Sequence, residues 1–380
     1  MKNLKAIITY GVIIALCLAA LAGYMISNRN SGGKEAAAAG STETAAPSSA
    51  AAEGTAAAGT AADATVEETT AAPAANLSAN AAERLEKSGS APESDPVVGV
   101  GRGDDYETVT RKAIENAGGL EGVIHKGDTV LIKPNICTYA EPGSPMITDY
   151  RMVQEIVDIC REYEAGKIII AEGPITGLAF DFMNGAVNGY KNIKDVEFVE
   201  LNDLDKEDCY GIKAEKSDTG KSFFIPKVYM DADVVISAPK LKTHFQPESY
   251  VSLCLKNMYG VPPGKIYGLG YKIGLHALGL KESLVDLSKI GRADFYVIDG
   301  IVGGEGYGPL NNQPVDSKII LAGKNPVAVD TAALTFMGFT VDEIPTVKLA
   351  AQENLGVADL AKIKVVGEDI EKAKMQFARP

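Results

Sequence analysis

The sequence predicts an α/β fold in which a mostly parallel sheet is flanked by helices. From residue 94 onward, short apolar runs rich in β-branched residues alternate with segments whose apolar side chains have helical spacing. This alternation is typical of βαβ units. About 285 residues show it, which is enough for one large domain or two small lobes.

Seven apolar runs are expected to form the strands. They are bounded by Gly, Pro, Asn or Asp residues, which favour turns at the ends of strands. These runs lie at 96–100, 129–135, 167–171, 196–201, 234–238, 295–299 and 318–322.

Three helices between these strands have clear limits. The segment 106–116 is followed by two glycines, and 150–163 carries apolar residues three and four positions apart. The segment 326–336 begins with a proline after Asn325, a good N-cap residue, and Gly338 follows it as a stop.

Residues 1–33 are predicted to be a signal anchor or signal peptide. Lys2 and Lys5 precede an apolar stretch at 6–26. About twenty apolar residues span a bilayer, and the lysines ahead of them stay in the cytoplasm. An A-x-A cleavage site occurs at 20–22, but the apolar run continues past it. A retained anchor with an extracytoplasmic domain is therefore favoured over a secreted protein.

Residues 34–93 are expected to be a disordered linker between this leader and an α/β domain at 94–380. They consist mostly of Ala, Thr, Ser, Glu and Pro, with almost no large apolar side chains. Such a segment cannot bury enough surface to offset the entropy of ordering.

The bulk charge and the cysteines exclude several classes of site. A net charge of −13 and a pI of about 4.9 argue against a nucleic-acid partner, so any anion site must be a local basic pocket. The five cysteines form no CxxC pair, so the chain has no iron-sulfur or zinc-ribbon motif. We expect those beyond the leader to be buried thiols.

The stretch 237–260 carries the strongest indication of a ligand site. Lys240, Lys242 and His244 fall at every second position after an apolar strand, so an extended backbone points all three the same way. Lys256 follows within a short helical pattern. Cations at the end of a buried strand suit an anionic ligand.

Polar residues also follow other predicted strands. Ligands of open α/β sheets bind beyond the carboxyl ends of strands, so these residues are expected to line the same pocket. They are Lys133, Asn135, Glu172, Asp299 and Glu305.

We therefore expect an extracytoplasmic, membrane-tethered enzyme whose pocket holds a small anion, and the sequence does not identify its cofactor. His244 or His276 is expected to act as general acid/base, with Glu172 or Glu305 as its partner. The ligand-binding candidates are Lys133, Asn135, Lys240, Lys242, Lys256, Asn257 and Asp299.

Three alternatives remain open at this stage. The same pocket could bind an anion or a metal of the cell envelope without chemistry, or the protein could have a purely structural role. A divalent metal held by His244 and His276 is chemically acceptable.

Asp330, within an apolar helical segment, is expected either to face solvent or to pair with a buried cation such as Lys256.

The order of motifs resembles the domain-of-unknown-function 362 (DUF362) family over roughly residues 96–367. The matching segments are VLIKPNI at 130–136, IIIAEGP at 168–174, DVVISAPKLKTH at 233–244, LKNMYG at 255–260, VIDGIVGGEGYGP at 297–309 and NPVAVDTAA at 325–333. Many members carry a ferredoxin module, which implies redox chemistry, but this chain lacks its CxxCxxC runs.

A more distant similarity links the chain to the nickel-pincer lactate racemases. In that family a strand leads to a histidine and then to a lysine that anchors a phosphate-bearing cofactor. Here Ile236 and Ser237 lead to His244 and then Lys256, without the glycine-rich stretch before that lysine. The similarity implies hydroxy-acid or cofactor chemistry, including isomerase chemistry.

Overall fold

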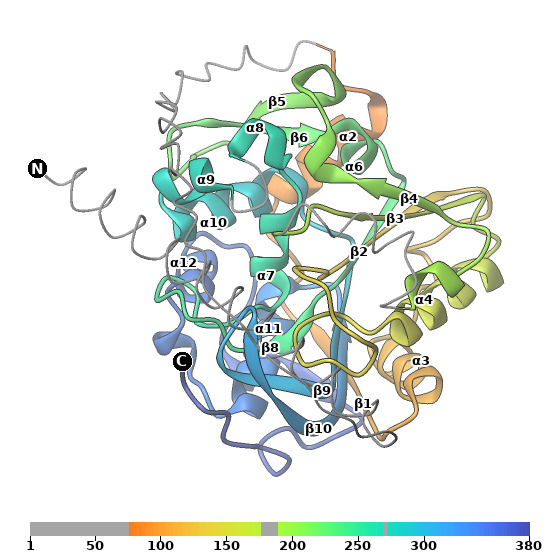
Figure 1. Cartoon of the computed structure of the whole chain (residues 1–380), viewed down its shortest axis with the longest axis vertical. Coiled ribbons are helices and arrows are strands. Elements are labelled where there is room, and N and C mark those ends of the chain that lie inside the picture. Colours follow the sequence, from red (N-terminus) through yellow and green to blue (C-terminus); the bar gives the residue numbers. More distant parts are fainter. Residues whose placement is uncertain (1–75, 176–188, 269–271) are drawn as a thin grey trace, which may run out of the picture. The chain divides into compact units, whose positions relative to one another are not determined.

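The computed structural model describes residues 76–175, 189–268 and 272–380, and within them nine strands form one mixed sheet. Eight strands lie in the order β11-β1-β10-β9-β7-β2-β3-β4, and β8 pairs with β9 (Figure 1). Their bounds are β1 (Val97–Arg102), β2 (Thr129–Pro134), β3 (Lys167–Glu172), β4 (Glu197–Glu200), β7 (Val234–Ala238), β8 (Lys240–Lys242), β9 (Phe295–Tyr307), β10 (Asn311–Gly323) and β11 (Lys364–Val366).

Most neighbouring strands are parallel. β2 runs parallel to β3 and β7, β3 to β4, and β7 and β8 to β9, while β10 is antiparallel to both β9 and β1. The predicted α/β class with a mostly parallel sheet is confirmed. The described residues from 76 onward belong to one compact unit rather than to two lobes.

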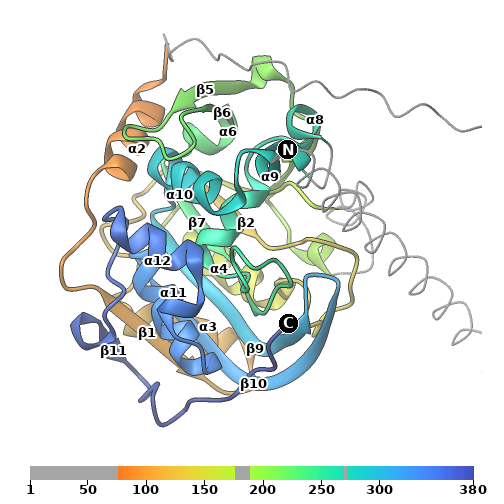
Figure 2. The ribbon, with the colours of Figure 1, turned by 90° about the vertical axis from the view of Figure 1, so that its left-hand side faces the viewer.

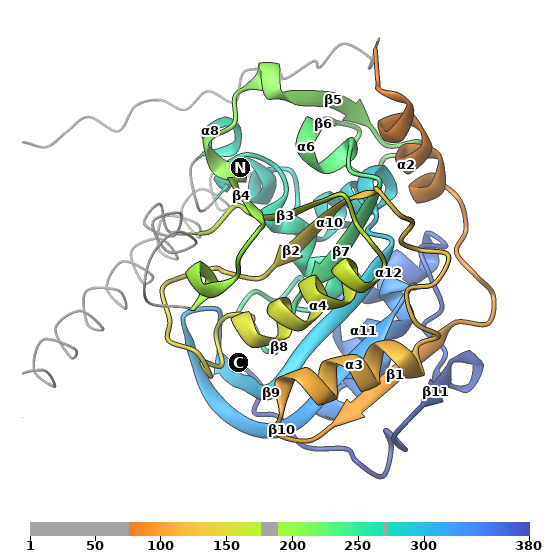
Figure 3. The ribbon, with the colours of Figure 1, turned by 90° about the vertical axis from the view of Figure 1, so that its right-hand side faces the viewer.

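The two faces of the sheet are buried under different helices because strand side chains alternate. Val130 and Ile132 pack on the side of α3 (Tyr106–Asn116) and α4 (Tyr150–Glu162), which Figure 3 shows in front of the sheet. Leu131 packs in the cluster on the opposite side. Figure 2 shows that side, where α10 (Leu280–Gly291), α11 (Pro326–Met337) and α12 (Pro345–Gln352) lie.

The three predicted helices are confirmed. α3 and α4 match the expected segments to within a residue. At the start of α11 the side chain of Asn325 accepts a hydrogen bond from the Ala328 amide at 3.0 Å, and Gly338 ends the helix with a left-handed φ of 84°.

The expected linker contains an ordered helix, so its limit at residue 93 is wrong. α2 (Ala79–Gly89) is capped by Ser78 and buries Ala81 and Arg84. Arg84 forms an ion pair with Asp294 at 2.8 Å, and this long-range contact orders a segment whose composition alone indicates disorder.

The leader at 1–33 and the linker up to residue 75 lie outside the described residues. Within the residues that are described, no helix combines the length and the apolarity needed to cross a bilayer.

The strand expected at 295–299 is much longer than predicted. β9 and β10 each contain 13 residues and form a long hairpin, so the glycine-rich stretch after Asp299 is strand rather than loop. Glycine is required there by close packing: a Cβ on Gly304 would lie 2.5 Å from the carbonyl oxygen of Pro145.

Shorter elements complete the described part of the chain. β5 (Cys209–Lys213) and β6 (Ser222–Pro226) form a separate two-stranded sheet. The short helices are α6 (Lys227–Met230), α7 (Cys254–Asn257), α8 (Gly264–Tyr267) and α9 (Ile273–Ala277). Cys137, Cys160, Cys209 and Cys254 are free and buried, as the sequence predicted for cysteines beyond the leader.

Candidate functional site

A small pocket lies where β2, β3 and the segments after β7 and β8 meet α7. Its cavity volume is about 30 Å³, which is space for one or two water molecules. It is lined by Lys133, Asn135, Cys137, Glu172, Gly173, Pro174, Ile175, Lys242, His244, Ser252, Lys256, Asn257, Tyr259, Gly260 and Pro309.

Seven of the predicted site residues therefore line one pocket, and four do not. The seven are Lys133, Asn135, Glu172, Lys242, His244, Lys256 and Asn257. Lys240, His276, Asp299 and Glu305 are not among the residues that line it.

The base of the pocket is a saturated network around Lys133. Its Nζ donates to Glu172 Oε1 at 2.9 Å, Asn257 Oδ1 at 3.1 Å and the carbonyl of Pro134 at 3.0 Å. The other oxygen of Glu172 accepts from the Ile136 amide at 3.0 Å. Both oxygens of Glu172 thus accept hydrogen bonds from protein groups, so this carboxylate has a structural role and is not free to act as a base.

Gly260 allows this network to form. A Cβ at this position would lie 2.1 Å from Glu172 Oε1 and 2.6 Å from Lys133 Nζ. The chain after α7 can approach the buried ion pair this closely only without a side chain, because real Cβ contacts are longer.

Lys242 is also held by protein atoms. Its Nζ donates to the Met146 carbonyl at 2.5 Å and lies 3.2 Å from Cys137 Sγ. Burial lowers the pKa of Lys242, and the nearby Cys137 opposes that shift.

Lys256 has no hydrogen-bond acceptor among the described residues. Its Nζ lies 4.2 Å from the centre of the Tyr259 ring. Burial, followed by repulsion from Lys242, lowers the pKa of Lys256 to about 7. The uncharged form of this amine is therefore accessible near neutral pH.

His244 presents an oriented hydrogen-bond donor. Its Nδ1 accepts from the Gln246 amide at 3.2 Å, so the neutral ring carries its proton on Nε2. Nε2 has no partner among the described residues. Burial and the charges of Lys256 and Lys242 hold the pKa of His244 well below 6.5, so the ring is neutral at pH 7.

His276 lies behind Tyr259 rather than on the pocket wall. Its Nε2 is 2.9 Å from the Tyr259 hydroxyl and 3.2 Å from Gln246 Nε2. Burial lowers the pKa of His276 to about 3, with Lys256 contributing. Its position suits it to orient Tyr259.

Lys240 and Asp299 form a separate buried ion pair. Lys240 Nζ donates to Asp299 Oδ2 at 2.8 Å, and both side chains are fully buried. The same oxygen accepts from the Asp149 amide at 2.8 Å. Burial raises the pKa of Asp299, and Lys240 opposes this. This pair joins β8 to β9 and leaves neither charge buried without a partner.

Two further predictions concern single side chains. Glu305 lies far along β9, where its Oε2 accepts from the Ala378 amide at 2.7 Å. Asn135 contributes a buried Oδ1 that has no hydrogen-bond partner among the described residues.

Asp330 adopts neither of its two expected roles. It accepts hydrogen bonds from the amides of Cys254 at 2.8 Å and Leu255 at 3.2 Å, at the start of α7. Burial raises its pKa to about 7. Asp330 of α11 therefore fixes the position of the short helix that carries Lys256.

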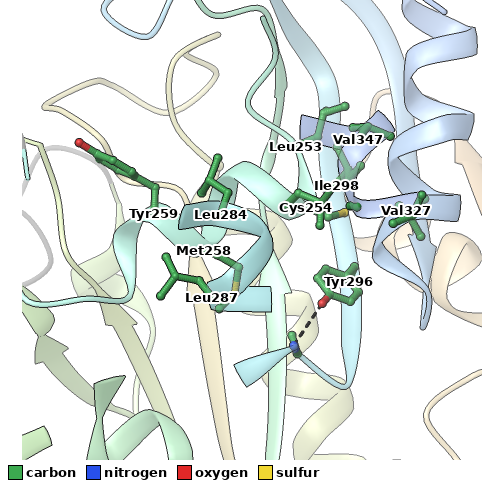
Figure 4. Packing of buried hydrophobic residues seen from close by; sticks show 14 of the residues in the cluster. Leu253, Cys254, Met258, Tyr259, Leu284, Leu287, Tyr296, Ile298, Val327 and Val347 are labelled. Atoms are coloured by element: carbon green, nitrogen blue, oxygen red, sulfur yellow. Dashed lines mark hydrogen bonds between the residues drawn. The ribbon is translucent and has the colours of Figure 1, made fainter. Parts of the chain in front are cut away.

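The apolar side of this segment anchors it against the core. Figure 4 shows Cys254 and Met258 packed among side chains of α10 and α11, such as Leu287 and Val327. With one side buried in this way, Lys256 and Asn257 are left to face the pocket.

Sequence reasoning missed Lys272. It is fully buried, has a left-handed φ of 43°, and its Nζ donates to the carbonyls of Gly173 at 3.2 Å and Tyr259 at 3.1 Å. Burial lowers its pKa to about 7. It follows no predicted strand, so no local pattern marks it.

A metal site at His244 and His276 is not formed by the residues described. No group of three or more His, Cys, Asp or Glu side chains in that part of the chain is arranged to hold a metal ion.

Comparison with known proteins shows relatives in sequence and in structure. The thylakoid-associated protein sll1697 of Synechocystis is 32% identical over 251 residues, covering 65% of this chain and 74% of that protein. The lactate racemase apoprotein from Thermoanaerobacterium thermosaccharolyticum has a TM-score of 0.40 at 15% identity, covering 62% of this chain and 56% of the racemase.

A second solved structure, a Thermotoga maritima protein, has a TM-score of 0.36 at 12% identity and covers 66% of this chain and 60% of that protein. The chain thus spans less than two thirds of the length of either solved structure.

The sequence comparison with protein families matches residues 130–335, which contain the pocket and more than half of the chain. The matching family is described as a domain of unknown function, DUF362. Together with the Synechocystis relative, this match establishes that the chain belongs to the DUF362 family.

Proposed function

We propose that this protein is an enzyme that acts on a small anion bound in the pocket beside Lys256. The observation that carries the proposal is the pair of donors without partners among the described residues, Lys256 Nζ and His244 Nε2. An anionic ligand provides acceptors for both and restores the charged form of Lys256.

The surrounding charges support an anion rather than a cation. Three lysines line the pocket, while Glu172 is the carboxylate among the described lining residues, and it is already bound to Lys133. Lys272 adds a further buried amine behind this wall. A second cation in this setting would increase the repulsion that already lowers the pKa of Lys256.

Binding can be tested by thermal melting of the full chain with acetate, phosphate and sulfate, against chloride at matched ionic strength. An anion that binds the folded chain raises the melting temperature. We expect His244→Ala and Lys256→Ala each to weaken this effect by about tenfold or more in affinity. Lys265→Ala is the matched control, since Lys265 pairs with Asp205 on the surface. Equal responses in all variants would refute the site.

A non-catalytic binding module is the second candidate. Glu172, the expected partner of a catalytic histidine, has both oxygens occupied, and His244 is neutral with Nδ1 already accepting a hydrogen bond. Recovery of a bound ligand unaltered after long incubation, judged by NMR, favours this candidate over the enzyme.

We also propose that the domain is extracytoplasmic and tethered by residues 1–33, or secreted if the leader is cleaved. The lysines ahead of the apolar stretch support this orientation. The thylakoid-associated name of the Synechocystis relative is compatible with a membrane location. An alkaline phosphatase fused after the leader is expected to be active, and an inactive fusion would refute export.

A further inference from the structure

Lys256 differs from the other lysines at the pocket in what its amine contacts. Lys133 and Lys242 each donate to protein oxygens, and so does Lys272 behind the wall. Lys256 lines the cavity, has 9% of its surface exposed, and has no hydrogen-bond acceptor in the described part of the chain. Its lone pair is therefore the one that a ligand can reach when the amine is uncharged.

The neighbours of Lys256 add the other parts of a reactive site. His244 Nε2–H is a donor directed by the Gln246 amide, and it can hydrogen-bond to an oxygen that gains negative charge. Lys242 lines the same cavity, and its amine is a further donor beside it for a second, anionic group of the same ligand. A nucleophile and two nitrogen donors thus surround one cavity.

From this geometry we propose that Lys256 forms an imine with a small aldehyde or ketone that also carries an anionic group. This deepens the proposed function, on which it rests, by naming the class of substrate. The cavity of about 30 Å³ has space for one or two water molecules, so even the smallest member of the class must displace them and widen the pocket.

The step is balanced without any further reactant. The uncharged Nζ attacks the carbonyl carbon, so a C–N bond forms while the carbonyl π electrons move to oxygen. His244 Nε2–H hydrogen-bonds to that oxygen. Both hydrogens of the amine then leave with the oxygen as water, and the C=N bond remains. Uncharged amines of this kind are the usual imine-forming lysines.

The test uses the full chain, purified in detergent, with glyoxylate and cyanoborohydride at pH 7. Cyanoborohydride delivers a hydride to the imine carbon and leaves a stable secondary amine, which peptide mass spectrometry can locate. We expect Lys256 to be labelled at least about tenfold faster than the surface residue Lys265, whose pKa is raised by Asp205. Failure to label Lys256 would overturn the proposal.

Lys272 is a control within the same protein. Burial lowers the pKa of both Lys272 and Lys256 to about 7, but Lys272 donates to two carbonyls and is fully buried. If pocket geometry selects the nucleophile, Lys256 is labelled and Lys272 is not. Equal labelling of the two would overturn the assignment to Lys256.

The anionic requirement is tested with glycolaldehyde, a neutral aldehyde of similar size. We expect it to label Lys256 about tenfold more slowly than glyoxylate does, because it lacks the group that Lys242 and its neighbours attract. Equal rates would overturn the substrate class.

Anion binding and imine formation can fail separately. If acetate or phosphate raises the melting temperature but glyoxylate leaves no adduct, the proposed function stands and this inference falls. If glyoxylate labels Lys256 while no simple anion is bound, the proposed anion site falls. Loss of both results removes both proposals.

Discussion

Lys240 and Lys256 are two buried lysines whose surroundings give them opposite roles. Lys240 Nζ lies 2.8 Å from a carboxylate oxygen of Asp299, and both side chains are fully buried. Lys256 contacts the face of the Tyr259 ring and has no acceptor among the described residues. Removing one member of a buried ion pair leaves the other charge uncompensated, whereas a buried amine that lacks an acceptor costs stability and is available to a ligand.

The largest effect is expected when the paired lysine is removed. Lys240→Met leaves Asp299 buried without its cation, which costs about 3–5 kcal/mol of unfolding free energy. Urea denaturation of the variant and the wild type measures the difference. Lys265→Met, at an exposed ion pair, is the matched control and should change little. A loss as small as that of the control would mean that this pair does not hold β8 to β9.

A smaller effect of opposite sign is expected at Lys256. Lys256→Met removes a buried amine with no acceptor among the described residues, so stability at pH 7 should rise by about 1–3 kcal/mol. The folded-state pKa of about 7 lies below the ordinary 10.5, so the unfolded chain binds more protons between these values. Wild-type stability should therefore increase with pH across this window, and the variant should gain less.

Urea denaturation at pH 7 and pH 9 separates these expectations. A variant that is less stable than wild type at pH 7 would show that Lys256 contributes to the fold as Lys240 does. The same variant should lose the response of the melting temperature to anions, because stability and binding depend on the same amine.

The strands that position the site were predictable from sequence, since β2, β3 and β7 are continuous apolar runs with clear ends. The β9–β10 hairpin was not, because the glycines after Asp299 are typical of loops. These glycines are needed because β9 packs closely against segments that are distant in the sequence, and such packing leaves no local pattern. For the same reason the ordered helix α2 could not be separated from the alanine-rich segment before it.

The pocket was predictable in outline but not in its partners. Alternation along an extended segment indicated Lys240, Lys242 and His244 together, and all three are buried. Lys240 is paired because Asp299 lies beside it. The oxygens of Glu172 are occupied in part because the backbone amides of Ile136 and Gly173 donate to them. Such contacts arise only when distant strands are brought into register.

The smallest effect, and the one that best separates binding from reaction, is the dependence on pH. An anion binds the charged form of Lys256, whose pKa is about 7, so affinity for acetate or phosphate should fall about tenfold per pH unit above 7. Imine formation needs the uncharged amine, so labelling by glyoxylate should rise through the same range. Melting curves and labelling rates between pH 6 and about 9 measure the two. Because one amine controls both, the two profiles should cross near its pKa, and profiles that change in the same direction would assign the two activities to different groups.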